Sequence, residues 1–97
     1  MNRMPSLFIS HGSPMFAVEP GKAGPQLAQL GRELPAPTAV LVLSPHWITR
    51  GLSVATTAAP ETIHDFGGFP DELYRIQYPA PGAPGVAMRA LELLKLF

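Results

Sequence analysis

The feature that most constrains the fold is the run TAVLVLS at residues 38–44, which is continuously apolar from Ala39 to Leu43. The run does not alternate between apolar and polar positions, and it is rich in residues that favour strands. A continuous run of this length is typical of a strand that is buried on both of its faces. Such strands occur in parallel sheets that helices cover on both sides. The run therefore predicts an α/β fold with a buried sheet.

The residues before this run predict a strand–helix–strand unit. Residues 6–10 (SLFIS) form a short apolar run typical of a first buried strand, and residues 25–34 place leucines at helical spacing. Pro25 suits the first turn of that helix, where backbone N–H groups have no partner within the helix. A crossover of this kind is right-handed and makes the two strands parallel neighbours.

Three further elements follow along the chain. We expect a third strand at residues 52–57, a helical turn at 71–78 and a helix at 84–97. The fold class expected from the whole pattern is α/β, with a mostly parallel sheet and flanking helices.

The composition indicates that this α/β domain is incomplete. The chain has 97 residues, and only 14% of them are charged, well below the usual share of about 25%. A parallel sheet needs cover on both faces, yet the pattern offers only two helices of useful length. The last helix reaches Phe97 without a glycine cap or a polar tail. We therefore expect a chain that is truncated at its C-terminus, or that pairs with a second chain to complete the fold.

Charge and cysteine content exclude several classes of protein. Seven Lys and Arg residues balance seven Asp and Glu residues, so no basic surface is expected for nucleic acid. The absence of cysteine excludes disulfide scaffolds, thiolate metal sites and cysteine nucleophiles. The apolar run near the N-terminus is too short for a signal peptide or a membrane span. We therefore expect a soluble, cytoplasmic protein that binds neither nucleic acid nor membrane.

Two histidines follow the first two predicted strands at the point where each strand ends. His11 comes directly after residues 6–10, and His46 comes two residues after the run at 38–44. Parallel neighbours lie about 4.8 Å apart, and their carboxyl ends share the edge where open α/β sheets bind ligands. Neutral imidazole is a good ligand for zinc, iron and copper. The spacing therefore indicates one metal ion held by both rings; the alternative is two unrelated loop histidines with satisfied hydrogen bonds.

The segment TIHDFGGFP at residues 62–70 holds the third histidine, His64. Its two glycines permit positive φ and let the backbone approach a ligand closely, and Phe66 adds an aromatic wall. Asp65 either orients His64 or supplies a carboxylate of its own. Trp47, near the second histidine, is interpreted as a substrate platform or, as more often in proteins, as a core residue. The alternative for the whole segment is an ordinary loop with buried aromatic side chains.

Four motifs, taken in order, resemble one known family. They are PSLFISHGSPM at residues 5–15, SPHW at 44–47, IHDFGGFP at 63–70, and Leu73-Tyr74 followed by YPAPG at 78–82. Together they are similar to the class III extradiol ring-cleavage dioxygenases of the LigB type, and in particular to the DOPA extradiol dioxygenase branch. Each motif alone is weak, but the four together cover nearly the whole chain.

The resemblance implies a metal-dependent dioxygenase that uses O₂ to open a catechol-type, DOPA-like ring beside its hydroxyl groups. It implies His11 and His46 as ligands of one Fe²⁺ or Zn²⁺ ion, and we assign His64 to catalysis, as an acid–base or substrate-positioning residue. The residues assigned to substrate binding are Ser13, Trp47, Asp65, Phe66 and Gly67. Family members are more than twice as long, so residues 1–97 are expected to be the N-terminal portion of a single extradiol dioxygenase domain, with the remaining metal ligand outside them.

Two other functions stay open at this point. One is a truncated, non-catalytic remnant that binds a metal ion or a partner. The other is a zinc-dependent hydrolase at the same strand ends, with metal-activated water as the nucleophile. The hydrolase ranks third, because no glutamate is placed as an obvious general base.

Overall fold

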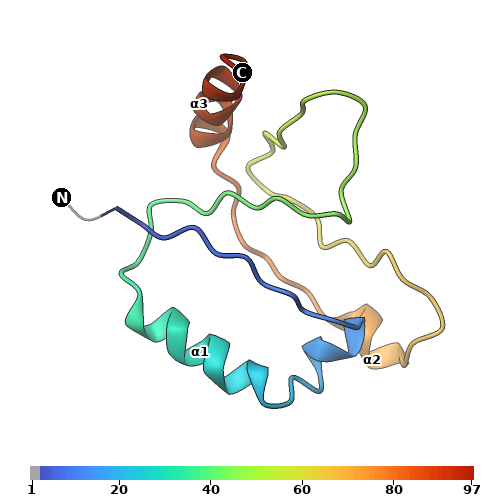
Figure 1. The fold of residues 1–97 in the computed structure, drawn as a ribbon. Coiled ribbons are helices and arrows are strands. Elements are labelled where there is room, and N and C mark those ends of the chain that lie inside the picture. The colour runs from blue at the N-terminus through green and yellow to red at the C-terminus, as the bar shows by residue number, and fades with distance from the viewer. Residues whose placement is uncertain (1–2) are drawn as a thin grey trace. The chain divides into compact units, whose positions relative to one another are not determined.

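The computed structural model describes residues 3–97, which form two compact units. The first unit comprises the chain up to Thr38 together with Phe66–Ile76, and the second comprises Ala39–Asp65 together with Gln77–Phe97. Each unit thus draws on two separate stretches of the chain, and each is described by itself. The helices are labelled in Figure 1.

Helix α1 (Ala23–Glu33) of the first unit corresponds to the helix predicted at residues 25–34. It begins two residues earlier than predicted, and the Gly24 N–H donates a hydrogen bond to the Pro20 carbonyl oxygen at 3.1 Å. The helix ends before Leu34, which has extended backbone. A proline disfavours helical backbone at the residue that precedes it, so Pro35 ends the helix at this point.

The core of the first unit lies where the short 3₁₀ helix η1 (Pro14–Ala17) contacts α2 (Asp71–Arg75). Leu73 of α2 is only 2% exposed, and it is the one buried hydrophobic residue among residues 3–97. The helical turn predicted at residues 71–78 is therefore present, but it ends at Arg75. Beyond it the backbone is extended at Ile76.

An aromatic cluster of Phe66, Phe69 and Tyr74 lies beside the two exposed glycines of the first unit's GGFP segment. The Phe66 ring lies edge-on to Phe69 with centroids 5.4 Å apart, and it lies 5.1 Å from the Tyr74 ring. The Tyr74 hydroxyl donates to the Phe66 carbonyl oxygen at 3.3 Å and accepts from the Phe69 N–H at 3.4 Å. Gly68 has φ of 76°, a backbone conformation that glycine adopts without a steric penalty. The cluster therefore holds this turn closed.

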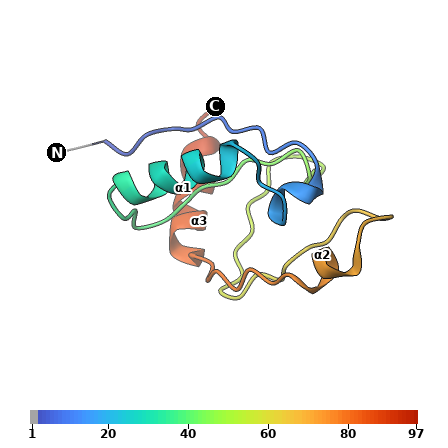
Figure 2. The ribbon, with the colours of Figure 1, turned by 90° about the horizontal axis from the view of Figure 1, so that it is seen from below.

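Helix α3 (Pro84–Leu94) belongs to the second unit and is drawn in red in Figures 1 and 2. It begins at the predicted residue, with proline in its first turn. It ends three residues before the predicted Phe97, because the last residues form tighter turns. The Leu96 N–H donates to the Leu93 carbonyl oxygen at 3.2 Å, an i to i+3 bond of the kind that closes many helices. No helix among residues 3–97 is long and apolar enough to cross a bilayer.

Two hydrogen bonds join the separate stretches of the second unit. The Gly82 N–H donates to the Ala58 carbonyl oxygen at 2.9 Å, and the Tyr78 N–H donates to the Thr62 hydroxyl at 2.9 Å. The YPAPG motif therefore runs beside the segment that leads to His64. At Gly82 the two backbones are so close that a Cβ atom would overlap the Thr57 carbonyl oxygen.

We expect Gly82→Ala to lower the free energy of unfolding of the protein by about 1–3 kcal/mol. This is the usual cost of forcing an extra carbon into a packed position. Denaturant unfolding followed by circular dichroism measures this change. Gly85→Ala in α3 is the matched control, because its Cβ would meet no atom within 4 Å and alanine favours a helix. Equal losses in both variants would contradict the steric explanation.

The segments predicted as strands form no regular secondary structure in the described part of the chain. Residues 6–10, 38–44 and 52–57 are drawn as plain traces in Figures 1 and 2. Their apolar side chains are largely exposed, and those of Phe8 and Leu43 are fully so. The mostly parallel sheet, and with it the α/β class, therefore stays a prediction from the sequence.

Candidate metal-ligand site around His46

A tight turn at the end of the apolar run positions His46 in the second unit. The Ser44 carbonyl oxygen accepts a hydrogen bond from the Trp47 N–H at 3.3 Å, which closes a four-residue turn. The Ser44 hydroxyl also accepts from the His46 N–H at 3.1 Å. Serine at the first position and Pro45 at the second are favoured in such turns, because proline presets the backbone angle. The sequence SPHW therefore fixes the backbone from which the imidazole projects.

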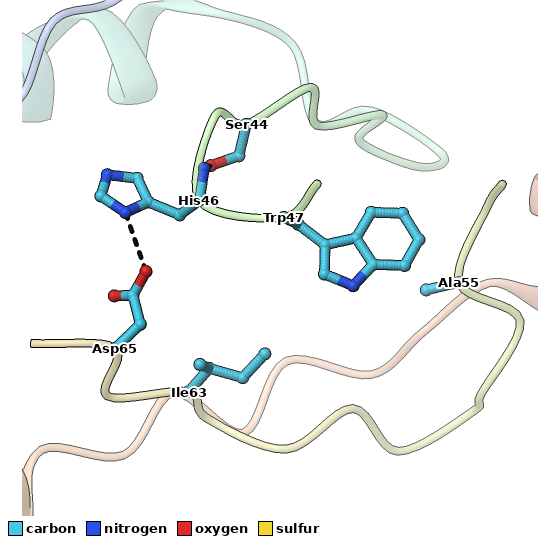
Figure 3. Close-up of a pocket in the computed structure, with 6 residues that line it drawn as sticks. All are labelled: Ser44, His46, Trp47, Ala55, Ile63 and Asp65. Carbon is cyan, nitrogen blue, oxygen red and sulfur yellow. Dashed lines mark hydrogen bonds and ion pairs between the residues drawn. The ribbon is translucent and has the colours of Figure 1, made fainter. Parts of the chain in front are cut away.

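The His46 ring contacts the carboxylate of Asp65. His46 Nδ1 lies 2.8 Å from Asp65 Oδ2, across 19 positions of the sequence (Figure 3). A carboxylate only accepts hydrogen bonds, so a neutral imidazole in this contact carries its proton on Nδ1. The lone pair that can bind a metal is then on Nε2.

An open cavity of about 290 Å³ lies beside this pair. It is lined by Ser44, His46, Trp47, Ala55, Ile63 and Asp65 (Figure 3). The histidine and the aspartate form a polar side, whereas the indole and the two aliphatic side chains form an apolar side. The indole is half-exposed, and its role as a substrate platform or a core residue stays a prediction. A flat ring with polar substituents suits a cavity of this mixed character.

The other predicted site residues lie elsewhere in the two units. His64 is half-buried and lies between two cavity residues along the chain, but it is not among those that line the cavity. Phe66 and Gly67 belong to the aromatic cluster of the first unit. The Ser13 hydroxyl accepts from the Met15 N–H at 3.1 Å and so caps η1.

His11 belongs to the first unit and His46 to the second. The site that the two histidines share therefore stays a prediction. Among residues 3–97 no three His, Cys, Asp or Glu side chains are grouped so that they could hold a metal ion. The residues around His46 fit part of a ligand set, since a histidine that binds a metal commonly donates its other ring N–H to a carboxylate.

Reasoning from the sequence missed the contact between His46 and Asp65. It placed the carboxylate beside the adjacent His64 or left it to act alone, because no local pattern links positions 19 residues apart. It also missed Ala55 and Ile63 as cavity residues, for which the sequence holds no signal. The capping role of Ser13 did have a signal, because serine followed by proline is a common start of a helix.

Comparison with known proteins places the chain in a family. The model of the catalytic LigB subunit of aromatic ring-opening dioxygenase matches residues 5–96. The 4,5-DOPA dioxygenase extradiol of Escherichia coli (strain K12) is 52% identical over 92 residues, which are 95% of this chain and 34% of that protein. The proteins of the same name from Beta vulgaris and Mirabilis jalapa are 42% and 38% identical, again over 34% of their length.

The chain thus spans about a third of the length of the curated relatives it matches. No solved structure matches it. Because the family model covers nearly all of its residues, the chain belongs to the family of the catalytic LigB subunit of aromatic ring-opening dioxygenases.

Proposed function

We propose that residues 1–97 are part of a metal-dependent extradiol dioxygenase that opens a catechol-type, DOPA-like ring with O₂. The observation that carries the proposal is the His46–Asp65 contact at the edge of a cavity whose other side is formed by Trp47. The family of the chain and the names of its relatives support the same reaction. A ring-opening enzyme needs a metal ligand next to a surface that accepts an aromatic ring, and the pairing of His46 with Asp65 beside an apolar wall supports assigning both roles to this cavity.

In this proposal His46 and His11 hold one Fe²⁺ or Zn²⁺ ion together with a ligand outside the chain. Two histidines and a carboxylate are a common ligand set for non-haem iron in oxygenases. A bound Fe²⁺ ion supplies the redox chemistry that a reaction with O₂ requires, whereas Zn²⁺ has none. The ring-opening reaction therefore favours iron as the active metal.

The chain's own residues would bind and orient the substrate. Trp47 and Ile63 present apolar surface on which an aromatic ring can stack, beside the metal ligand His46. His64 lies within one residue of the cavity wall on either side along the chain. We assign it the acid–base or substrate-positioning role, because imidazole exchanges protons near neutral pH.

Measuring O₂ uptake tests the proposal. The intact protein, loaded with Fe²⁺ under anaerobic conditions, should consume one O₂ per molecule of 3,4-dihydroxyphenylalanine when air is admitted. With isotopically labelled O₂, mass spectrometry should find one labelled atom in the new carboxylate of the opened product, because the oxygen of the new aldehyde exchanges with water. The zinc-loaded protein should consume none.

The controls separate this function from its alternatives. His64→Ala should impair turnover while leaving the metal content unchanged. If the iron-loaded protein consumes no O₂ with any catechol, the proposal is wrong. Ester or amide hydrolysis by the zinc-loaded protein would then favour the hydrolase, and metal binding without either activity would favour the non-catalytic remnant.

A further inference from the structure

We infer that Asp65 is a positioning residue for His46, and that it selects Nε2 as the nitrogen with which His46 binds a metal ion. The inference rests on the proposed role of His46 as a ligand. The contact between Nδ1 and Oδ2, at 2.8 Å, is the observation from which it starts.

The turn at residues 44–47 fixes the backbone of His46 but not the orientation of its ring. The two hydrogen bonds to Ser44 come from main-chain N–H groups, those of His46 and Trp47. Rotation about the Cβ–Cγ bond would exchange Nδ1 with the ring carbon Cδ2, and Nε2 with the ring carbon Cε1. The contact with Asp65 opposes that exchange, because it holds Nδ1 against the carboxylate (Figure 3).

The contact also determines which nitrogen carries the proton. A neutral imidazole has one N–H and one lone pair, and only the nitrogen with the lone pair binds a metal. The carboxylate accepts the Nδ1 proton, so the lone pair is on Nε2. A carboxylate on the other nitrogen also makes a metal-bound imidazole a stronger donor.

The contact between His46 and Asp65 is too exposed to contribute much to the stability of the fold. The side chains of His46 and Asp65 are 54% and 40% exposed, and ion pairs with that exposure add little to the stability of a fold. Asp65 also forms part of the cavity wall beside the ring that it orients. The placement suits a residue whose contribution appears when His46 binds a ligand.

Nitrogen NMR of the intact, metal-free protein reads the tautomer directly. His46 should carry its proton on Nδ1, and Asp65→Ala should shift the population toward the Nε2–H form. In a separate titration with a competing chelator, Asp65→Ala should weaken Zn²⁺ binding by about 10–100-fold, the usual effect of losing such a partner. Asp65→Asn keeps an acceptor oxygen and should retain the Nδ1–H tautomer with a smaller loss of affinity.

Glu61→Ala is the matched control for charge, since it removes an exposed carboxylate from the same unit. It should change neither the tautomer nor the affinity for Zn²⁺. An unchanged tautomer in Asp65→Ala would overturn the inference. A loss in Asp65→Asn as large as in His46→Ala would also overturn it, because Asp65 would then be a ligand itself.

These readouts do not depend on catalysis. A protein with the expected tautomer and Zn²⁺ affinities that opens no catechol would refute the proposed function and leave the role of Asp65 standing. A protein in which His46→Ala still binds Zn²⁺ with unchanged affinity would refute the positioning role, whatever its activity.

Discussion

Replacing His46 with alanine should abolish tight binding of one Fe²⁺ or Zn²⁺ ion by the intact protein. The loss should exceed the roughly 10–100-fold effect of removing a partner that only orients a ligand, because a metal–nitrogen bond itself disappears. Anaerobic titration against a chelator of known affinity measures it. His11→Ala should have the same effect, since both rings are proposed to bind one ion.

The control for this pair of variants is the third histidine. His64→Ala should retain one metal ion per protein, because we assign His64 to the substrate rather than to the metal. Stoichiometric metal retained with unchanged affinity in either His11→Ala or His46→Ala would contradict the shared site. Loss in all three variants would make His64 a further ligand and would contradict its proposed role.

Replacing Leu73 with alanine should lower the free energy of unfolding by about 2–5 kcal/mol, the range measured for buried leucines elsewhere. Leu73 is 2% exposed where α2 contacts η1, so the change removes buried methyl groups and leaves a cavity. Denaturant unfolding of the intact protein measures the loss. A loss below about 1 kcal/mol would contradict the position of Leu73 in the core.

Leu43→Ala is the informative comparison, because this side chain is fully exposed in the structure. An exposed leucine should cost less than about 0.5 kcal/mol when truncated. The predicted sheet requires the opposite, since Leu43 lies in the run expected to be buried on both faces. Equal losses at Leu43 and Leu73 would therefore support the sheet in the intact protein, and a loss confined to Leu73 would count against it.

Local signals explain how much of this structure could be predicted. The leucine spacing of residues 25–34 and the proline at residue 84 indicate two helices, and α1 and α3 lie there. Their ends shift by a few residues because caps and proline neighbours, rather than periodicity, determine where a helix stops. Strands depend on pairing with distant segments, so an apolar run such as residues 38–44 indicates burial without showing which segment provides it.

The candidate site shows the same division between local and distant information. The turn that carries His46 follows from SPHW, because serine, proline and a tight turn go together. The partner of Asp65 does not follow from the sequence, since adjacency favours His64 and the structure instead gives His46. The path of the chain between residues 47 and 65 brings the two side chains together, and no motif encodes that path.

The exposed run at residues 38–44 makes the protein prone to aggregation until these side chains are covered. A segment of this length that is apolar, uncharged and rich in β-forming residues has the composition of an aggregation-prone strand. Pro37 and Pro45 bound it on both sides, and proline cannot donate the hydrogen bond that would extend an intermolecular ladder. Such flanking residues act as gatekeepers of hydrophobic strands. Pro45, which presets the turn that contains His46, thus also limits how far one copy of the chain can pair with another during synthesis.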